Sequence, residues 1–409
     1  MKISIIGAGS TYTPELIEGI AEGLLGANLD ELVFMDTNPE RLRILGGLAQ
    51  RMLARGGWNG RLQLTTSQEA ALDGVDACLI QYRIGGSAAR IRDEAVALEH
   101  GVIGQETVGP GGWVSAMRTV PPTLEIAEEL ARRSPRAWLL DFANPVSIVT
   151  QALVDGGHRA IGLCNVAIAL QRSVATRLAI DPERVEVESA GLNHASWYRD
   201  IRVDGVSHMS ELIDSAADTL AAAGKVSESR IRSERAVPSY YLRYYHDTAS
   251  VLAEQQRDGT RGTDVLRIER ELLSLYDDPN LDTKPALLEQ RGGAHYSSAA
   301  LHLLGALCGN RPRRMVVNAM NGGAIPDLPP TLVIEALCEV DQLGARPVLT
   351  APLGSPRVNL IGELGEFTMA TARAAAARDT TSAIQALALN PLVPSRSLAE
   401  SLGTALLTD

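Results

Sequence analysis

A cysteine and a histidine in two similar short motifs are the first residues that suggest chemistry. Cys164 lies in Gly162-Leu163-Cys164-Asn165, and His194 ends Gly191-Leu192-Asn193-His194, 30 positions further on. Each motif follows an apolar run, where we expect a loop. A thiolate and an imidazole suit a borderline-soft divalent ion, and two ligands leave an open shell that substrate oxygens can complete. On this spacing alone, a buried thiol and a core histidine remain the simpler interpretation.

A cluster of phenols is the second candidate. Four of the nine tyrosines fall between positions 240 and 245, in the segment PSYYLRYY. A phenol beside a cation has a lowered pKa and can act as a base. Arg261, in the motif GTRG, can supply that charge or hold an anionic substrate. The alternative is a helix with an aromatic face that serves only packing.

Two polar loops are the third candidate. The segment QYRIGG at 81–86 continues through Arg90 to GQET at 104–107, and glycines beside arginines let backbone and guanidinium groups approach a ligand. Asn144 closes the next strand, in the segment DFANP. We expect both loops at the carboxyl edge of a parallel sheet, where ligands bind. A solvated, arginine-rich helix start is the alternative for the first loop.

A glycine turn near the N-terminus indicates a nucleotide. Gly7 and Gly9 follow the first apolar run and open a helix, which matches two of the three glycines of the dinucleotide fingerprint. Tyr12 stands at the third position. Asp36 ends the second apolar run, and a carboxylate there binds ribose hydroxyls and repels a 2′-phosphate, so NAD is favoured over NADP. The alternative is a glycine turn with a capping aspartate and no nucleotide.

The elements that must position these residues alternate in the first third of the chain. We predict strands at 3–6, 32–35, 77–81 and 138–142, and helices at 14–24 and 39–54, the second capped by Asn38 with Pro39 in its first turn. This alternation predicts an α/β fold with helices on both faces of a parallel sheet. Strands are predicted at 185–190 and 197–203, a loop at 221–224, and helices through most of 208–256 and 262–310 and near 330–343 and 364–390.

Composition narrows the classes of function. The 409 residues carry a net charge of −11, which argues against a nucleic-acid scaffold or a binder of anionic membranes. No apolar run is long enough to span a bilayer, and the short N-terminal run is expected to be a buried strand and not a signal peptide. The four cysteines show no C-x-x-C pattern, so we expect free thiols and a cytoplasmic location.

Taken together, the motifs resemble those of glycoside hydrolase family 4, most closely its 6-phospho-β-glucosidases. The matching segments run along nearly the whole chain: IIGAGSTYTPELI, QYRIGGSAARIRDE, GVIGQET, FANPV, IGLCN, GLNH, PSYYLRYY, TRGTDVL, RGGAHYS and VNAMNGGAIPDLP. The resemblance implies a Rossmann domain at 1–163 that binds NAD, joined to an α+β domain at 164–409 that binds metal and substrate, as in lactate and malate dehydrogenases. It also implies Mn²⁺ or another divalent metal, reducing conditions, and a homodimer or homotetramer.

The resemblance further implies a mechanism outside the two-carboxylate scheme of most glycosidases. NAD⁺ takes hydride from C3 of the sugar, Tyr241 removes the C2 proton, the aglycone leaves C1 by elimination, water adds, and NADH returns the hydride. Cys164 and His194 would hold the metal. The residue after the cysteine is Asn165, as in β-type members, so no side-chain general acid is assigned.

The remaining site residues are carried over from the same resemblance. Those expected to bind the cofactor are Gly7, Gly9, Ser10, Thr11 and Asp36; those expected to bind a phosphorylated disaccharide or glycoside are Arg90, Glu106, Asn144, Asn165, Asn193 and Arg261. Ala8 departs from the family pattern, and no single residue proves a 6-phosphate. Three alternatives therefore stay open: the same mechanism on another anionic or unphosphorylated glycoside, a plain NAD-dependent hydroxy-acid dehydrogenase, and a nucleotide-binding regulator.

Overall fold

The structure is a computed structural model that describes residues 1–291 and 296–408. Residues 292–295, in the middle of the RGGAHYS motif, lie outside the described residues. None of the described helices combines the length and the apolar character needed to cross a bilayer.

Six parallel strands form the centre of the molecule. Their spatial order is β3-β2-β1-β4-β5-β6, so the direction of chain progression reverses between β1 and β4. The register is regular: Ile3 pairs with Leu32 on one side and with Ala77 on the other. The strands are β1 (Lys2–Ile6), β2 (Glu31–Met35), β3 (Arg61–Thr65), β4 (Ala77–Ile80), β5 (Trp138–Asp141) and β6 (Ala160–Gly162). This is the predicted Rossmann arrangement, with β3 and β6 as strands that the sequence analysis did not predict.

Helices connect these strands. Asn38 caps α2 as predicted, because its side-chain oxygen accepts from the backbone N–H of Glu40 at 3.1 Å and of Arg41 at 3.0 Å. The connecting helices are α1 (Thr13–Ala21), α2 (Pro39–Arg55), α3 (Gln68–Leu72), α4 (Gly86–Glu99), α5 (Gly109–Arg133) and α6 (Val146–Asp155).

Three antiparallel strands extend the same sheet to nine strands beyond β6: β11 (Arg313–Met320), β12 (Val333–Asp341) and β13 (Gly344–Pro347). The predicted helix at 330–343 is therefore wrong. β12 lies between β11 and β13 and is buried on both faces, so its apolar residues are nearly continuous and show no clear period of two. Since these strands share the sheet of the first half, the division at residues 163 and 164 stays a prediction.

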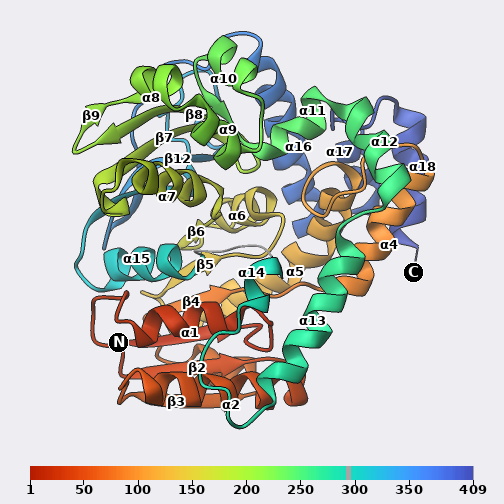
Figure 1. Cartoon of the computed structure of the whole chain (residues 1–409). Coiled ribbons are helices and arrows are strands. Elements are labelled where there is room, and N and C mark those ends of the chain that lie inside the picture. Colours follow the sequence, from red (N-terminus) through yellow and green to blue (C-terminus); the bar gives the residue numbers. More distant parts are fainter. Residues whose placement is uncertain (292–295, 409) are drawn as a thin grey trace.

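A second, smaller sheet lies above the first in Figure 1. It holds β7 (Val185–Leu192), β8 (Ala195–Val203) and β10 (Val237–Pro238), with β9 (Val206–Ser207) paired to β8. The first two were predicted. Residues 221–224, predicted as a loop, instead form the last turn of the helix α9 (Ala217–Gly224), because Ala221 and Ala222 are good helix formers and Gly224 ends the run.

The remaining segments are mostly helical, as predicted for 208–256, 262–310 and 364–390. The helices are α7 (Val166–Leu178), α8 (Met209–Ser215), α9 (Ala217–Gly224), α10 (Glu228–Glu234), α11 (Arg243–His246), α12 (Thr248–Asp258), α13 (Gly262–Tyr276), α14 (Leu287–Arg291), α15 (Tyr296–Cys308), α16 (Arg357–Ala377), α17 (Thr380–Leu387) and α18 (Arg396–Leu407), with 3₁₀ turns η1 (Pro182–Arg184) and η2 (Tyr240–Leu242).

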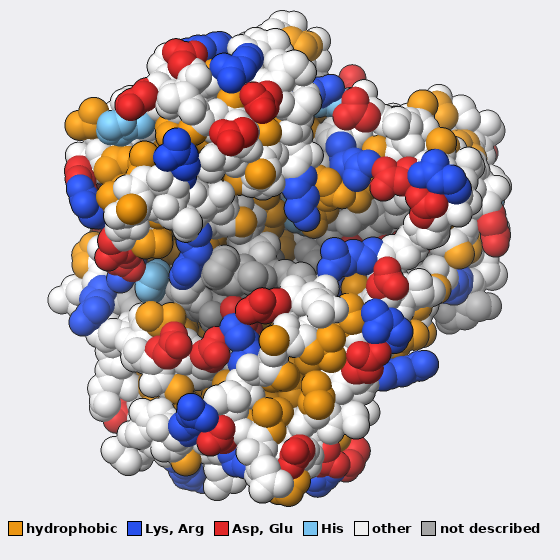
Figure 2. Space-filling model, viewed as in Figure 1, with side chains coloured by type: hydrophobic (Ala, Val, Ile, Leu, Met, Phe, Trp, Pro, Cys, Tyr) orange, Lys and Arg blue, Asp and Glu red, His pale blue; other side chains and the backbone are white. Residues whose placement is uncertain are grey.

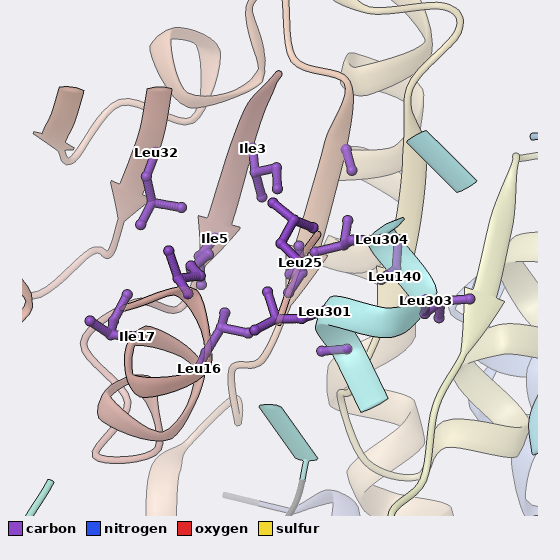
Figure 3. Packing of buried hydrophobic residues seen from close by; sticks show 14 of the residues in the cluster. Ile3, Ile5, Leu16, Ile17, Leu25, Leu32, Leu140, Leu301, Leu303 and Leu304 are labelled. Carbon is purple, nitrogen blue, oxygen red and sulfur yellow. The ribbon is translucent and has the colours of Figure 1, made fainter. Parts of the chain in front are cut away.

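The large sheet is buried on both faces. Ile3 and Ile5 of β1 pack against Leu16 and Ile17 of α1 and against Leu301 of α15 (Figure 3). On the opposite face, side chains of the same strands pack against α5, α6 and α16. Each fully buried aliphatic side chain stabilises the fold by ~1.5–3 kcal/mol. The loops at the carboxyl edge therefore start from fixed strand ends.

Candidate active site

A cavity of about 1190 Å³ opens at the carboxyl edge of the parallel strands. Its wall runs from the turn after β1 and the end of β2, through the loops after β4 and β5, to η2 and the start of α13. Because the strand order reverses between β1 and β4, the loops diverge there and leave room for a ligand. Figure 2 shows the molecular face hollowed at mid-height, with charged side chains around the hollow.

The glycine turn forms one end of this cavity. Gly7 has a φ of +84°, and the N–H of Gly9 donates to Oδ2 of Asp36 at 2.8 Å. A Cβ on Gly9 would lie 2.6 Å from that carboxylate oxygen, so the turn has no room for a side chain. A side-chain-free turn, the start of α1 and a carboxylate at the end of β2 are the parts that a dinucleotide needs, so these residues fit NAD.

Most of the predicted cofactor residues line the cavity, and one does not. Gly7, Gly9, Ser10 and Asp36 are in the wall. Thr11 is fully buried; its carbonyl accepts from the phenol of Tyr276 at 2.8 Å, and its hydroxyl has no hydrogen-bond partner among the described residues. The structure thus places Thr11 behind the cavity wall.

The predicted metal ligands lie together. Cys164 follows β6, His194 lies in the tight turn between β7 and β8 with a φ of +64°, and Sγ of the cysteine is 3.5 Å from Nε2 of the histidine. Burial lowers the pKa of His194 to about 3, against the opposing charge of Glu106, so the ring is neutral at physiological pH and one nitrogen keeps a lone pair.

This pair suits a divalent metal. The 3.5 Å between Sγ and Nε2 is short enough for both atoms to bind one divalent ion. Among the described residues, no group of three or more His, Cys, Asp and Glu side chains forms a closed metal site. Two protein donors leave coordination positions for substrate oxygens, which is the pattern of a catalytic site.

Tyr241 covers the histidine. The two rings are stacked with centroids 3.5 Å apart. The neighbouring Tyr240 is engaged elsewhere, because its hydroxyl accepts from Nη1 of Arg243 at 2.9 Å. Of the two adjacent tyrosines, Tyr241 is therefore the one that faces the Cys164–His194 pair.

The sequence analysis predicts a lowered pKa for a phenol beside a cation, and for Tyr241 this prediction is wrong. Burial raises the pKa of Tyr241 well above its usual range, and the negative charges of Cys164 and Glu106 raise it further. The cation that lowers it is Arg90. Arg261 lines the cavity, but its guanidinium donates to the carbonyl of Gln290 at 2.8 Å.

An ion-pair network centred on Arg90 and Glu106 links α4 to the loops after β4 and after α4. Nη1 of Arg90 lies 3.0 Å from Glu106, and Nε lies 2.8 Å from Glu94. Arg83 makes a further ion pair with Glu106. Although burial opposes ionisation, Arg83 and Arg90 hold the pKa of Glu106 below its usual range. Arg83 and Glu94 were not among the predicted site residues, although Glu94 stands four positions after Arg90, which is the spacing of an ion pair on a helix.

The predicted asparagines have different surroundings. Asn144 and Asn165 line the cavity. Asn193 is buried behind it and donates to Oε1 of Glu335 at 2.9 Å, while Ser196 donates to the other oxygen at 2.8 Å. Burial raises the pKa of Glu335. The sequence analysis missed this residue because it lies in β12, which was predicted to be a helix.

Comparison with known proteins identifies the family. The family model described as family 4 glycosyl hydrolase matches residues 2–180, and the model of its C-terminal domain matches residues 189–393. The chain belongs to glycosyl hydrolase family 4. It is 37% identical to a probable 6-phospho-beta-glucosidase of Bacillus subtilis, over 98% of this chain and 94% of that protein. It is 34% identical to the 6-phospho-beta-glucosidase of Escherichia coli, over 98% and 93%.

Solved structures confirm the fold. The 6-phospho-beta glucosidase of Thermotoga maritima with NAD and glucose-6-phosphate superposes with a TM-score of 0.93 at 28% identity, over 100% of this chain and 97% of that one. A lactate dehydrogenase from a deep-sea metagenome superposes with a TM-score of 0.56 at 13% identity, over 91% and 98%. The predicted dehydrogenase-like architecture of this family 4 member is therefore confirmed.

Proposed function

We propose that this family 4 member hydrolyses 6-phospho-β-glucosides, using NAD and a divalent metal such as Mn²⁺. The observation that carries the proposal is that His194, which is paired with Cys164, and Tyr241, which is stacked on His194, line the same cavity as the glycine turn and Asp36. The relatives of Bacillus subtilis and Escherichia coli support the substrate class by their names. A T. maritima structure with manganese, NAD⁺ and glucose-6-phosphate supports the cofactors.

When bound, the dinucleotide supplies reversible hydride acceptance at C3 of the sugar, and the metal supplies Lewis-acid polarisation of the C2 and C3 oxygens. Cys164 and His194 are the residues that would hold the ion, and Gly7, Gly9, Ser10 and Asp36 those that would hold the dinucleotide.

Tyr241 is the base in this scheme. Its Oη accepts the proton from C2, the electron pair of that C–H bond expels the aglycone oxygen from C1, and the same phenol returns a proton to C2 when water adds at C1. Arg90 favours the phenolate, because it is the cation that lowers the pKa of Tyr241. The stack on His194 holds the phenol at the edge of the metal site.

Polar side chains around the cavity position the sugar. Glu106, kept ionised by Arg83 and Arg90, accepts hydrogen bonds from sugar hydroxyls. Asn144, Asn165 and Arg261 line the same cavity, and the guanidinium of Arg261 suits the 6-phosphate. No side chain is assigned as the acid for the leaving group, since Asn165 stands where an acid would be needed.

The test is a panel of nitrophenyl glycosides with and without a 6-phosphate, supplied with NAD⁺, Mn²⁺ and thiol. We expect release of nitrophenol from the 6-phospho-β-glucoside, with no net NADH. Cleavage of only a uronide or an unphosphorylated glucoside would replace the substrate class. Full activity without both NAD⁺ and metal would overturn the mechanism, and NADH formed in step with substrate consumption would indicate a dehydrogenase.

We also propose a homodimer or homotetramer and a cytoplasmic location, which rest on the family resemblance and on the sparse cysteines. Sedimentation velocity of the purified enzyme tests the first, and fractionation of the producing cell tests the second.

A further inference from the structure

The side chains of Gln105 and Thr107 are hydrogen-bonded to each other, and Thr107 in turn contacts the ring of His194. Both precede α5, in the loop after α4. The side-chain oxygen of Gln105 accepts from the backbone N–H of Thr107 at 2.5 Å and of Val108 at 2.9 Å. A backbone N–H can only donate, so the side-chain atom that two of them share must be the amide oxygen and not the amide nitrogen. The orientation of this buried amide is thereby settled.

The same oxygen decides what the hydroxyl of Thr107 does. Oγ1 lies 2.8 Å from Oε1 of Gln105, and an amide oxygen only accepts, so the hydroxyl must give its single hydrogen to it. On its other side, Oγ1 lies 2.9 Å from Nδ1 of His194. With its hydrogen already used, the hydroxyl offers the ring only lone pairs.

It follows that Nδ1 of His194 is the nitrogen that carries a hydrogen. In the neutral ring the lone pair is then on Nε2, which is the atom 3.5 Å from Sγ of Cys164. The stack on Tyr241 restrains the ring plane, with 3° between the two planes. A stack does not distinguish the two nitrogens, however, and it does not oppose a flip of the ring about the Cβ–Cγ bond, which leaves the plane unchanged. The bond to Thr107 does distinguish them, because Nδ1 is the nitrogen that lies within hydrogen-bond distance of its hydroxyl.

We propose that Gln105 and Thr107 are positioning residues that hold His194 as the Nδ1–H tautomer, so that Nε2 presents its lone pair toward Cys164. The consequence for metal binding rests on the proposed function; the tautomer itself does not. Partners of this kind on the second ring nitrogen orient metal-binding histidines in other proteins.

The first experiment measures the tautomer without metal. The full-length, metal-free enzyme is labelled with ¹⁵N-histidine, and the ring nitrogen shifts of His194 are assigned by loss of its signals in His194→Gln. We expect hydrogen on Nδ1 in the wild type and in Thr107→Ser, and a mixture of tautomers in Thr107→Val. Hydrogen on Nε2 in the wild type would overturn the proposal, and so would an unchanged tautomer in Thr107→Val.

The matched control is Thr371→Val, because that hydroxyl is also buried but, in the part of the chain that the structure describes, has no hydrogen-bond partner; it lies in α16, outside the cavity wall. It should leave the signals of His194 unchanged. Should Thr107→Val fail to fold, the wild-type spectrum alone still decides the tautomer, and Thr107→Ala provides a smaller replacement.

The second experiment titrates the same proteins with Mn²⁺ by calorimetry. Thr107→Val should weaken Mn²⁺ binding by ~10–100-fold, with Thr107→Ser restoring it. Excess Mn²⁺ should recover the kcat of Thr107→Val, which a general structural defect would not allow. Wild-type affinity in Thr107→Val would overturn the role in metal binding. If the wild type shows the expected tautomer but binds no metal, the proposed function fails while the assignment of the tautomer stands.

Discussion

The rings of His194 and Tyr241 are stacked face to face, with 3.5 Å between their centroids and 3° between their planes. One ring belongs to the turn between β7 and β8, and the other to η2. The contact puts a phenol directly against the imidazole of the Cys164–His194 pair. Substitutions that change one of these groups and keep the other therefore test the proposed base and the proposed metal ligands separately.

Replacing Tyr241 by Phe should separate the base from the metal site. Phenylalanine keeps the stack on His194 and removes only Oη. We expect kcat to fall by at least ~10²-fold, the usual contribution of a positioned base, while calorimetric Mn²⁺ affinity stays unchanged. Exchange of a C2 deuterium with solvent should disappear. Tyr240→Phe is the matched control, because its hydroxyl is bound to Arg243. Equal losses of kcat in both variants would contradict the assignment.

Replacing Cys164 by Ser should weaken the metal site and spare the dinucleotide. A serine hydroxyl is a poorer ligand than a thiolate for a borderline-soft ion. We expect Mn²⁺ affinity and turnover to fall strongly, while NAD⁺ binding, followed by fluorescence, remains that of the wild type. Cys308→Ser is the control, since that thiol lies at the end of α15, where it donates to the backbone carbonyl of Asp76 at 3.7 Å. Unchanged turnover in Cys164→Ser would refute the metal assignment.

Replacing Asp36 by Ala should weaken the binding of NAD⁺ and spare the metal site, which is the opposite of the result expected for Cys164→Ser. The carboxylate accepts from the N–H of Gly9 at 2.8 Å and of Asn38 at 2.9 Å, so its removal loosens the turn and also removes the acceptor for ribose. Loss of hydrogen bonds to a charged group costs ~1.5–3 kcal/mol, which corresponds to a rise of ~10–150-fold in the Kd for NAD⁺. Discrimination against NADP⁺ should shrink, and Mn²⁺ affinity should not change. An exposed residue, Asp73, provides the control substitution to Ala. Retained NAD⁺ affinity in Asp36→Ala would exclude the predicted role.

Asp141 predicts a pH-dependent stability. Burial raises its pKa to about 8, against hydrogen bonds from Ala143 N–H and the Thr150 hydroxyl. In the unfolded state the pKa of this carboxyl is ~3.9. At pH values between that pKa and the native pKa of about 8, the native state therefore holds one more proton than the unfolded state. The free energy of unfolding should therefore fall by ~1.4 kcal/mol per pH unit from this group as the pH rises.

Asp141→Asn removes the titration, so its stability relative to the wild type should rise between pH 5.5 and 7.5 (about 1.4 kcal/mol per unit) when measured by urea unfolding. The control is Asp341→Asn, because an exposed ion pair with Arg346 lowers the pKa of that carboxylate and leaves it ionised throughout this range. A difference between Asp141→Asn and the wild type that is the same at all three of pH 5.5, 6.5 and 7.5 would show that Asp141 does not titrate there.

Local signals in the sequence were sufficient for much of the fold. The apolar runs of β1, β2, β4 and β5, the Asn38–Pro39 start of α2 and the strands flanking GLNH are each specified by neighbouring residues, because periodicity and capping act over one or two turns. The same reasoning failed for β12. A strand buried on both faces has a nearly continuous apolar sequence, and that pattern does not distinguish a strand from a buried helix.

The sequence by itself also determined which residue types were available for chemistry: a glycine turn, an acidic strand end, one Cys and one His in similar motifs, and a tyrosine cluster. Only the tertiary structure decided how they are combined. Strand order, which no local pattern encodes, brings Thr107 to the ring of His194, 87 positions away, and Glu335 to Asn193, 142 positions away. Burial then decided the charge states, making His194 neutral and raising the pKa of Tyr241, because desolvation depends on the atoms that surround a group and not on its neighbours in the chain.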